Sequence, residues 1–89
     1  MSWIVTIHKK VKKGLNKLPK HIQEAFESLV VDLQDCGPVR GDWPNYSKLG
    51  DGTHHCHLNY SYVVVWTEED KQLKLIEVTY VGSRENAPY

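Results

Sequence analysis

The sequence predicts an α+β fold in which a twisted antiparallel sheet with an N-terminal strand carries a two-helix hairpin on one face. Three observations support this prediction: a short alternating segment opens the chain, two segments with helical apolar spacing follow, and β-rich runs separated by polar turns fill the second half. The 89 residues are 40% apolar and 25% charged, which suffices for one hydrophobic core. We therefore expect residues 1–89 to form a single domain.

The first element is a strand over residues 2–8. The segment alternates, with Trp3, Val5 and Ile7 on one side, and it is rich in β-branched and aromatic residues. This strand begins the chain and precedes both helices.

A short basic helix follows the first strand. Val11, Leu15 and Leu18 recur at helical spacing among lysines, which predicts an amphipathic helix. Gly14 inside it costs about 1 kcal/mol relative to alanine, so we expect the helix to need tertiary support.

The second helix is the clearest element of the sequence. It begins after Pro19 and ends at Cys36-Gly37-Pro38, a strong helix terminator. Its apolar stripe consists of Ile22, Phe26, Leu29, Val30 and Leu33. A turn containing proline joins the two helices, so we expect a helical hairpin that packs its apolar stripes on the sheet.

The pattern of residues in the second half of the sequence predicts a meander of strands. Residues 37–52 are rich in glycine and proline and read as a loop with a short strand near 46–49. Residues 54–58 and 60–67 then form a hairpin that turns at 59–61, and a polar turn at 68–71 leads to the last strand at 72–81. Residues 82–89 form a polar tail that begins with a glycine hinge.

Composition limits the classes of protein to consider. No apolar run reaches the roughly 20 residues that span a membrane, and the N-terminus lacks the pattern of a secretory signal. Two distant cysteines, Cys36 and Cys56, are too few for a disulfide scaffold and are expected to be free thiols. We therefore expect a soluble cytoplasmic protein.

Charge is segregated along the chain, although the formal net charge is zero. The lysines of the first twenty residues occur there without any acidic residue, whereas acidic residues dominate the next segment. These lysines are Lys9, Lys10, Lys12, Lys13, Lys17 and Lys20. They form either a solvated face or a surface that binds RNA phosphates.

Histidines surround a cysteine on one predicted strand. Alternation places His55 and His57 on one face and His54 and Cys56 on the other. Neighbouring strand residues that point in opposite directions cannot supply the four converging ligands of a structural zinc site, so we expect no metal and no cofactor. His55 and His57 either decorate a solvated face or belong to a catalytic site.

Arg84 and Tyr89 follow the last strand, which is expected to lie beside the histidine-bearing hairpin. Cleavage of RNA by its own ribose 2′-hydroxyl needs a base, an acid and a cation for the phosphate. Two imidazoles, a guanidinium and a phenol can fill these roles without a metal, which makes His55, His57, Arg84 and Tyr89 candidate catalytic residues. The alternative is that Arg84 pairs with Glu85 on a frayed, functionless terminus.

The order of elements, together with Leu18-Pro19 and the closing run Tyr80-Val81-Gly82-Ser83-Arg84-Glu85, resembles the RelE/ParE superfamily of bacterial toxins over essentially the whole chain. The resemblance implies that Arg84 matches the phosphate-binding arginine of the RelE-like branch and that Tyr89 matches its catalytic tyrosine. His55 and His57 fall where RelE-type members carry two lysines.

The resemblance also implies a function and partners. RelE-like members are ribosome-dependent messenger RNA endonucleases that a cognate antitoxin holds inactive, so the ribosome, messenger RNA and an antitoxin are the expected partners. Lys9, Lys10, Lys12, Lys13 and Lys17 would then meet ribosomal RNA, with His54 and Trp43 as second-rank site candidates. Two alternatives stay open: a ParE-like toxin that inhibits DNA gyrase by binding, and an inert member that only interacts.

Overall fold

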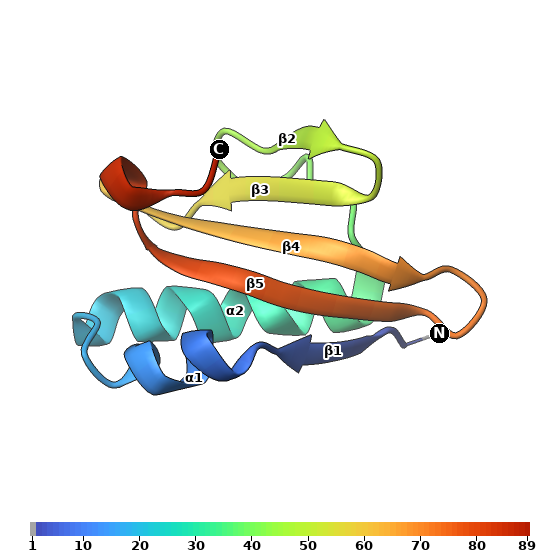
Figure 1. The fold of residues 1–89 in the computed structure, drawn as a ribbon, viewed down its shortest axis with the longest axis horizontal. Helices are drawn as coiled ribbons and strands as arrows, with labels where there is room; N and C mark the ends of the chain where they lie inside the picture. Colours follow the sequence, from blue (N-terminus) through green and yellow to red (C-terminus); the bar gives the residue numbers. More distant parts are fainter. Residues whose placement is uncertain (1) are drawn as a thin grey trace.

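A five-stranded mixed sheet and two helices form the fold, which a computed structural model describes for residues 2–89 (Figure 1). In chain order the elements are β1 (Ile4–Ile7), α1 (Lys9–Leu15), α2 (Lys20–Cys36), β2 (Ser47–Gly50), β3 (Thr53–His57), β4 (Tyr62–Asp70), β5 (Leu75–Ser83) and the 3₁₀ helix η1 (Arg84–Asn86). The predicted α+β class, with an N-terminal strand and a two-helix hairpin, is confirmed.

The sheet is antiparallel, as predicted, except for one pair of strands. The order across the sheet is β1-β5-β4-β3-β2, and β1 pairs with β5 in parallel from Ile4↔Leu75 to Ile7↔Val78, whereas all other neighbours are antiparallel. No hairpin joins β1 to β5, so no turn imposes an antiparallel arrangement on them. The chain between the two strands serves as the crossover connection that a parallel pair requires.

The two ends of β4 show how side chains set the turns. Asn59 Oδ1 accepts hydrogen bonds from the backbone N–H groups of Ser61 (2.8 Å) and Tyr62 (3.0 Å), which confirms the predicted turn at 59–61. The predicted turn at 68–71 was misplaced, because β4 continues to Asp70 and the turn occupies residues 71–74. Asp70 Oδ1 caps that turn through the N–H groups of Gln72 and Leu73, at 2.9 Å each.

Gly82 lies inside β5 and is not the hinge that the sequence suggested. A Cβ atom at this position would lie 2.8 Å from the hydroxyl oxygen of Tyr80, and that hydroxyl donates a 2.7 Å hydrogen bond to the backbone oxygen of Ser83. The glycine therefore leaves room for the Tyr80 ring to lie along the strand.

The main core lies between the helices and the sheet. It joins Phe26, Leu29 and Leu33 of α2 to Val64 and Trp66 of β4, together with residues of α1, β3 and β5. Val63 and Val65 point to the opposite face of the sheet and are also buried, at 0% and 3% exposed. The sheet is therefore covered on both faces at β4.

Two glycines in the helical half make opposite predictions for substitution by alanine. Gly37 ends α2 at φ 93° and ψ −171°, a region open essentially to glycine alone, and a Cβ there would lie 2.8 Å from Trp3 Nε1. Gly14 lies within α1 with no atom within 4 Å of its Cβ position. We expect Gly37→Ala to lower the free energy of unfolding by about 1–3 kcal/mol and Gly14→Ala to raise it by about 0.5–1 kcal/mol.

Urea denaturation of the two variants measures both changes. Equal effects of the two substitutions would contradict the prediction. The same change from glycine to alanine is expected to act in opposite directions because the two sites differ in backbone conformation and in the space around them.

Candidate active site

Two rows of side chains cross the sheet on the face away from the helices. The strand register aligns His55 of β3 with Val65 and Tyr80, and aligns His57 with Val63 and Gly82. In the row of His57, β5 contributes no side chain because its residue there is Gly82. The histidines thus lie beside an apolar floor made by β4.

Residues just before and within β2 hold the two histidine rings. Ser47 Oγ lies 3.0 Å from His55 Nδ1, and the side-chain amide nitrogen of Asn45 lies 3.4 Å from His57 Nδ1. The ring centroids of the two histidines are 5.9 Å apart. Sequence analysis missed Ser47 and Asn45 as site residues, although the pairing of a short strand near 46–49 with the histidine strand would have pointed to Ser47.

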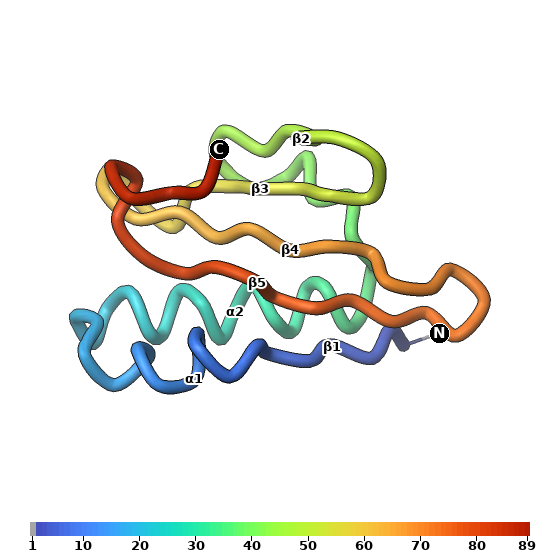
Figure 2. Tube along the Cα trace, in the orientation of Figure 1, coloured from blue at the N-terminus to red at the C-terminus, as the bar shows by residue number. Residues whose placement is uncertain are grey.

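The chain's last residues return across this face (Figure 2). The backbone N–H of Arg84 donates a 2.8 Å hydrogen bond to the oxygen of Ser61, which ties the start of η1 to the β3–β4 turn. Beyond η1, the Tyr89 ring lies 4.7 Å from the His55 ring between centroids. The expected return of the tail to the histidine-bearing hairpin is therefore present, whereas the catalytic roles of these residues stay a prediction.

Arg84 extends over the β3–β4 turn. Its Cζ atom lies 5.4 Å from the centroid of the Tyr60 ring. Among residues 2–89 the ion pair that forms joins Arg40 to Asp42. The alternative predicted from the sequence, an ion pair between Arg84 and Glu85, is not present among these residues. The guanidinium is left free to meet an anion.

Burial and neighbouring charge set the protonation of the site. Desolvation lowers the pKa of His57, and the neighbouring His55 and Arg84 lower it further. Desolvation raises the pKa of Tyr89, with Arg84 opposing that change. At neutral pH the site therefore holds a neutral imidazole and a protonated phenol, which are the states of a general base and a general acid.

His55 is more enclosed than His57. It is 8% exposed, with Nδ1 engaged by Ser47 and the ring under Tyr89. This position suits support of Tyr89 better than direct contact with a substrate.

His54 and Cys56 lie on the helix side, as alternation predicted, and do not share the site. The His54 ring contacts the rings of both Tyr46 and Trp66, at centroid distances of 5.8 and 5.9 Å, and these two rings also contact each other at 6.2 Å. His54 Nδ1 shares a 2.7 Å hydrogen bond with the Tyr46 hydroxyl. His54 is 1% exposed, which removes it from the surface that a substrate reaches. Burial raises the pKa of the Cys56 thiol to about 12, so this buried thiol stays unreactive.

His54 makes stability depend on pH. Burial, and then the charge of Lys48, lower its pKa below the ordinary 6.5, so between these two values the unfolded chain binds a proton that the folded chain does not. The stabilisation from neutral His54 is present above pH 6.5 and is lost as the pH falls through 6.5 toward the lowered pKa. Thermal unfolding between pH 7.5 and 5 should show a falling Tm.

The matched variant is His54→Phe, which keeps an aromatic ring in the stack and removes the titrating group. It should show a shallower dependence of Tm on pH than the wild type over the same range. Identical slopes would assign the acid sensitivity to another group.

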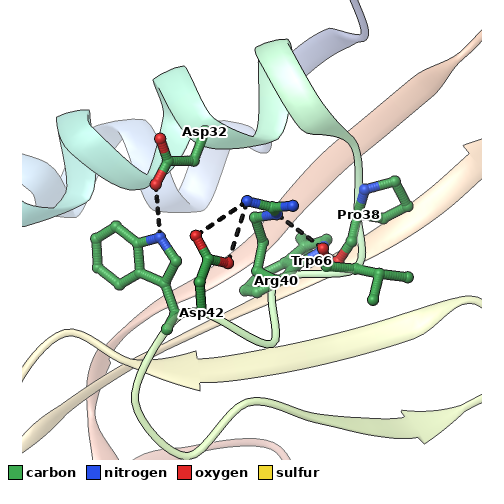
Figure 3. A network of polar contacts seen from close by, with 7 residues as sticks. Asp32, Pro38, Arg40, Asp42 and Trp66 are labelled. Atoms are coloured by element: carbon green, nitrogen blue, oxygen red, sulfur yellow. Dashed lines mark hydrogen bonds and ion pairs between the residues drawn. The ribbon is translucent and has the colours of Figure 1, made fainter.

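Trp43 anchors a loop and is not part of the histidine face. Asp32 of α2, labelled in Figure 3, accepts a 2.8 Å hydrogen bond from the indole Nε1 of Trp43. The Trp43 ring packs against the main core. In the same region Trp66 Nε1 donates to the Pro38 oxygen at 3.0 Å. Trp43 therefore caps the core.

The lysine-rich helix lies at the other edge of the sheet. Lys9, Lys10, Lys12, Lys13 and Lys17 are exposed on and just after α1. This helix continues from β1 and packs against β5, whereas the histidine strand β3 is separated from β1 by β5 and β4. The basic surface and the histidines are therefore two separate regions of the molecule.

Among residues 2–89 no three or more histidine, cysteine or acidic side chains gather in a way that could hold a metal ion. No helix in this part of the chain is long and apolar enough to cross a membrane.

Comparison with known proteins gives structural relatives. No family model matches the sequence, and no curated protein matches it. The archaeal RelE–RelB complex from Pyrococcus horikoshii OT3 is similar with a TM-score of 0.77 at 23% identity, covering 98% of this chain and 100% of that one. The isolated E. coli RelE toxin is similar with a TM-score of 0.74 at 16% identity, covering 98% and 89% of the two chains.

The YoeB–YefM complex from Staphylococcus aureus is similar with a TM-score of 0.71 at 13% identity, covering 94% and 99%. At identities this low, the structural similarity establishes the fold alone. The expected likeness of this chain to RelE-type proteins is thereby confirmed for its architecture.

Proposed function

We propose that this chain is the toxin of a type II toxin–antitoxin system and that it cleaves messenger RNA without a metal. The observation that supports this most directly is the histidine-bearing sheet face, where the Tyr89 ring lies 4.7 Å from the His55 ring and the His55 ring 5.9 Å from the His57 ring between centroids. Arg84 is near enough for its charge to lower the pKa of His57 further and to oppose the burial that raises the pKa of Tyr89. The fold of the RelE and YoeB toxins supports the same class of function.

In the proposed reaction the ribose 2′-oxygen attacks the adjacent phosphorus. The 2′-hydroxyl proton passes to His57 Nε2, and the P–O5′ bond breaks as Tyr89 gives its phenolic proton to the leaving 5′-oxygen. The products are a 2′,3′-cyclic phosphate and a free 5′-hydroxyl. Rotation of the Asn45 amide exchanges its oxygen and nitrogen, so Asn45 can hold the tautomer that leaves Nε2 unprotonated.

Arg84 is proposed to bind the phosphate as charge develops on it. A guanidinium makes paired, charge-assisted hydrogen bonds to phosphate oxygens, and this one has no carboxylate partner among residues 2–89. The lysines of α1 are proposed to bind ribosomal RNA away from the reaction, because phosphate contacts of that kind depend on exposed cations.

A cognate antitoxin is part of the proposal. Two of the similar structures are complexes, of RelE with RelB and of YoeB with YefM. An apolar groove of about 500 Å³ between α1 and α2 offers a surface for such a partner, and Val31 at its rim is 51% exposed.

Induction of the chain in cells without an antitoxin tests the proposal. We expect growth arrest and new messenger RNA ends in primer extension, and we expect Arg84→Ala to remove both. Lys71→Ala, which removes an exposed cation from the β4–β5 turn, is the control and should arrest growth like the wild type.

Other outcomes would reject the proposed reaction. Arrest with intact messengers and a DNA-damage response would instead indicate gyrase inhibition. Unimpaired growth on induction of the wild type would indicate an inert member of the fold.

A further inference from the structure

A hollow of about 360 Å³ opens where the β3–β4 turn meets the start of η1. We call it the Tyr60 hollow, and it is lined by Tyr60, Ser61, Tyr62, Ser83, Arg84 and Glu85. Its volume falls within the range of small-molecule sites, about 300–1,000 Å³. The proposed reaction uses Arg84 alone among these residues, so the other five lining residues have no role yet.

Tyr60 is the unusual member of this set. Its side chain is 83% exposed, so packing in the core does not explain a large aromatic residue here. The Arg84 guanidinium lies near the ring, 5.4 Å from its centroid. An exposed aromatic ring beside a guanidinium is the combination on which unpaired nucleobases stack in proteins that bind single-stranded RNA.

The backbone around Tyr60 is held on both sides. Asn59 Oδ1 accepts from the N–H groups of Ser61 and Tyr62, and the Ser61 oxygen accepts from the N–H of Arg84. Tyr62 is paired with Ser83 across β4 and β5. The ring is therefore presented by a preorganised turn, which reduces the entropy lost when a ligand stacks on it.

We propose that the Tyr60 hollow binds one unpaired nucleobase of RNA next to the phosphate that Arg84 holds. The proposal rests on the function proposed above and adds a base subsite to it. Tyr60 supplies the stacking surface, the Ser61 and Ser83 hydroxyls and the Glu85 carboxylate supply hydrogen-bonding groups at the base edge, and Arg84 links the hollow to the reacting phosphate.

Binding of an uncleavable RNA tests the subsite apart from the reaction. A short single-stranded oligonucleotide with 2′-O-methyl groups at every position lacks the nucleophile, and its affinity is measured by calorimetry. We expect Tyr60→Ala to weaken binding about tenfold and Tyr60→Phe to bind like the wild type, because the stacking surface and not the hydroxyl is used.

Two controls make the result specific. Leu73→Ala removes a 64% exposed apolar side chain from the other hairpin turn and should leave affinity unchanged. An oligonucleotide that lacks the base at the stacked position should bind wild type and Tyr60→Ala equally.

The outcomes separate the two proposals. Equal affinity of wild type and Tyr60→Ala, or no binding by the wild type, overturns the base subsite. The expected weaker binding of Tyr60→Ala, with no cleavage of ordinary RNA by the wild type, supports the subsite and overturns the proposed reaction.

Discussion

Replacing His57 by alanine should slow RNA cleavage by about 10²- to 10⁴-fold, the usual contribution of a positioned general base. His57 is the histidine of the site that remains partly exposed, and its ring is held by Asn45 near the Arg84 charge. Without the imidazole, water must accept the 2′-hydroxyl proton. The messenger cleavage rate, measured with ribosomes present, gives the size of the loss.

The pH dependence identifies the role of His57 in that loss. Because desolvation lowers its pKa, the base should stay unprotonated below pH 6.5, and the rate should fall only as the pH drops through the lowered pKa. His57→Ala should abolish this acidic limb. His21→Ala, which removes an exposed histidine from α2, is the matched control and should keep both the rate and the limb. An acidic limb that persists unchanged in His57→Ala would exclude His57 as the base.

Replacing Leu33 by alanine should lower the free energy of unfolding by about 2–5 kcal/mol, the range for a leucine removed from a packed core. Leu33 is 0% exposed and lies in the cluster that joins α2 to Trp66 and Val78. The close-packed neighbours cannot collapse fully into the space that the side chain leaves, so lost burial and an unfilled cavity add together.

Val31→Ala is the comparison on the same helix. Val31 is 51% exposed, and its truncation should change the free energy of unfolding by no more than about 0.5 kcal/mol. Urea denaturation of both variants measures the difference. Equal effects would mean that the helix packs on the sheet with another face.

Local spacing in the sequence accounts for most of the elements and for which face each residue takes. The apolar stripe from Ile22 to Leu33 is the buried face of α2, and Gly37 ends that helix as predicted. Strand alternation separated His55 and His57 from His54 and Cys56, and the structure has the same separation. These features depend on residues a few positions apart, whose relative directions follow from backbone geometry alone.

Local spacing did not predict the contacts between distant segments. The parallel pairing of β1 with β5 joins residues about seventy positions apart, and the position of the Tyr80 ring over Gly82 follows from close packing and not from pattern. The sequence offered His54 as a candidate site residue, whereas contacts with the Tyr46 and Trp66 rings leave it buried. Periodicity predicts on which face of an element a residue lies, but it does not predict which distant residues pack against that face.

The sequence by itself determined the class of the fold, the helix and strand segments and the grouping of the two histidines with each other. Tertiary structure alone decided that Tyr89 lies against His55, that Asn45 and Ser47 hold the imidazoles, and that Arg84 meets Tyr60. The reason is physical: backbone geometry orders near neighbours, whereas the approach of distant side chains depends on how the whole chain packs and which groups lose water.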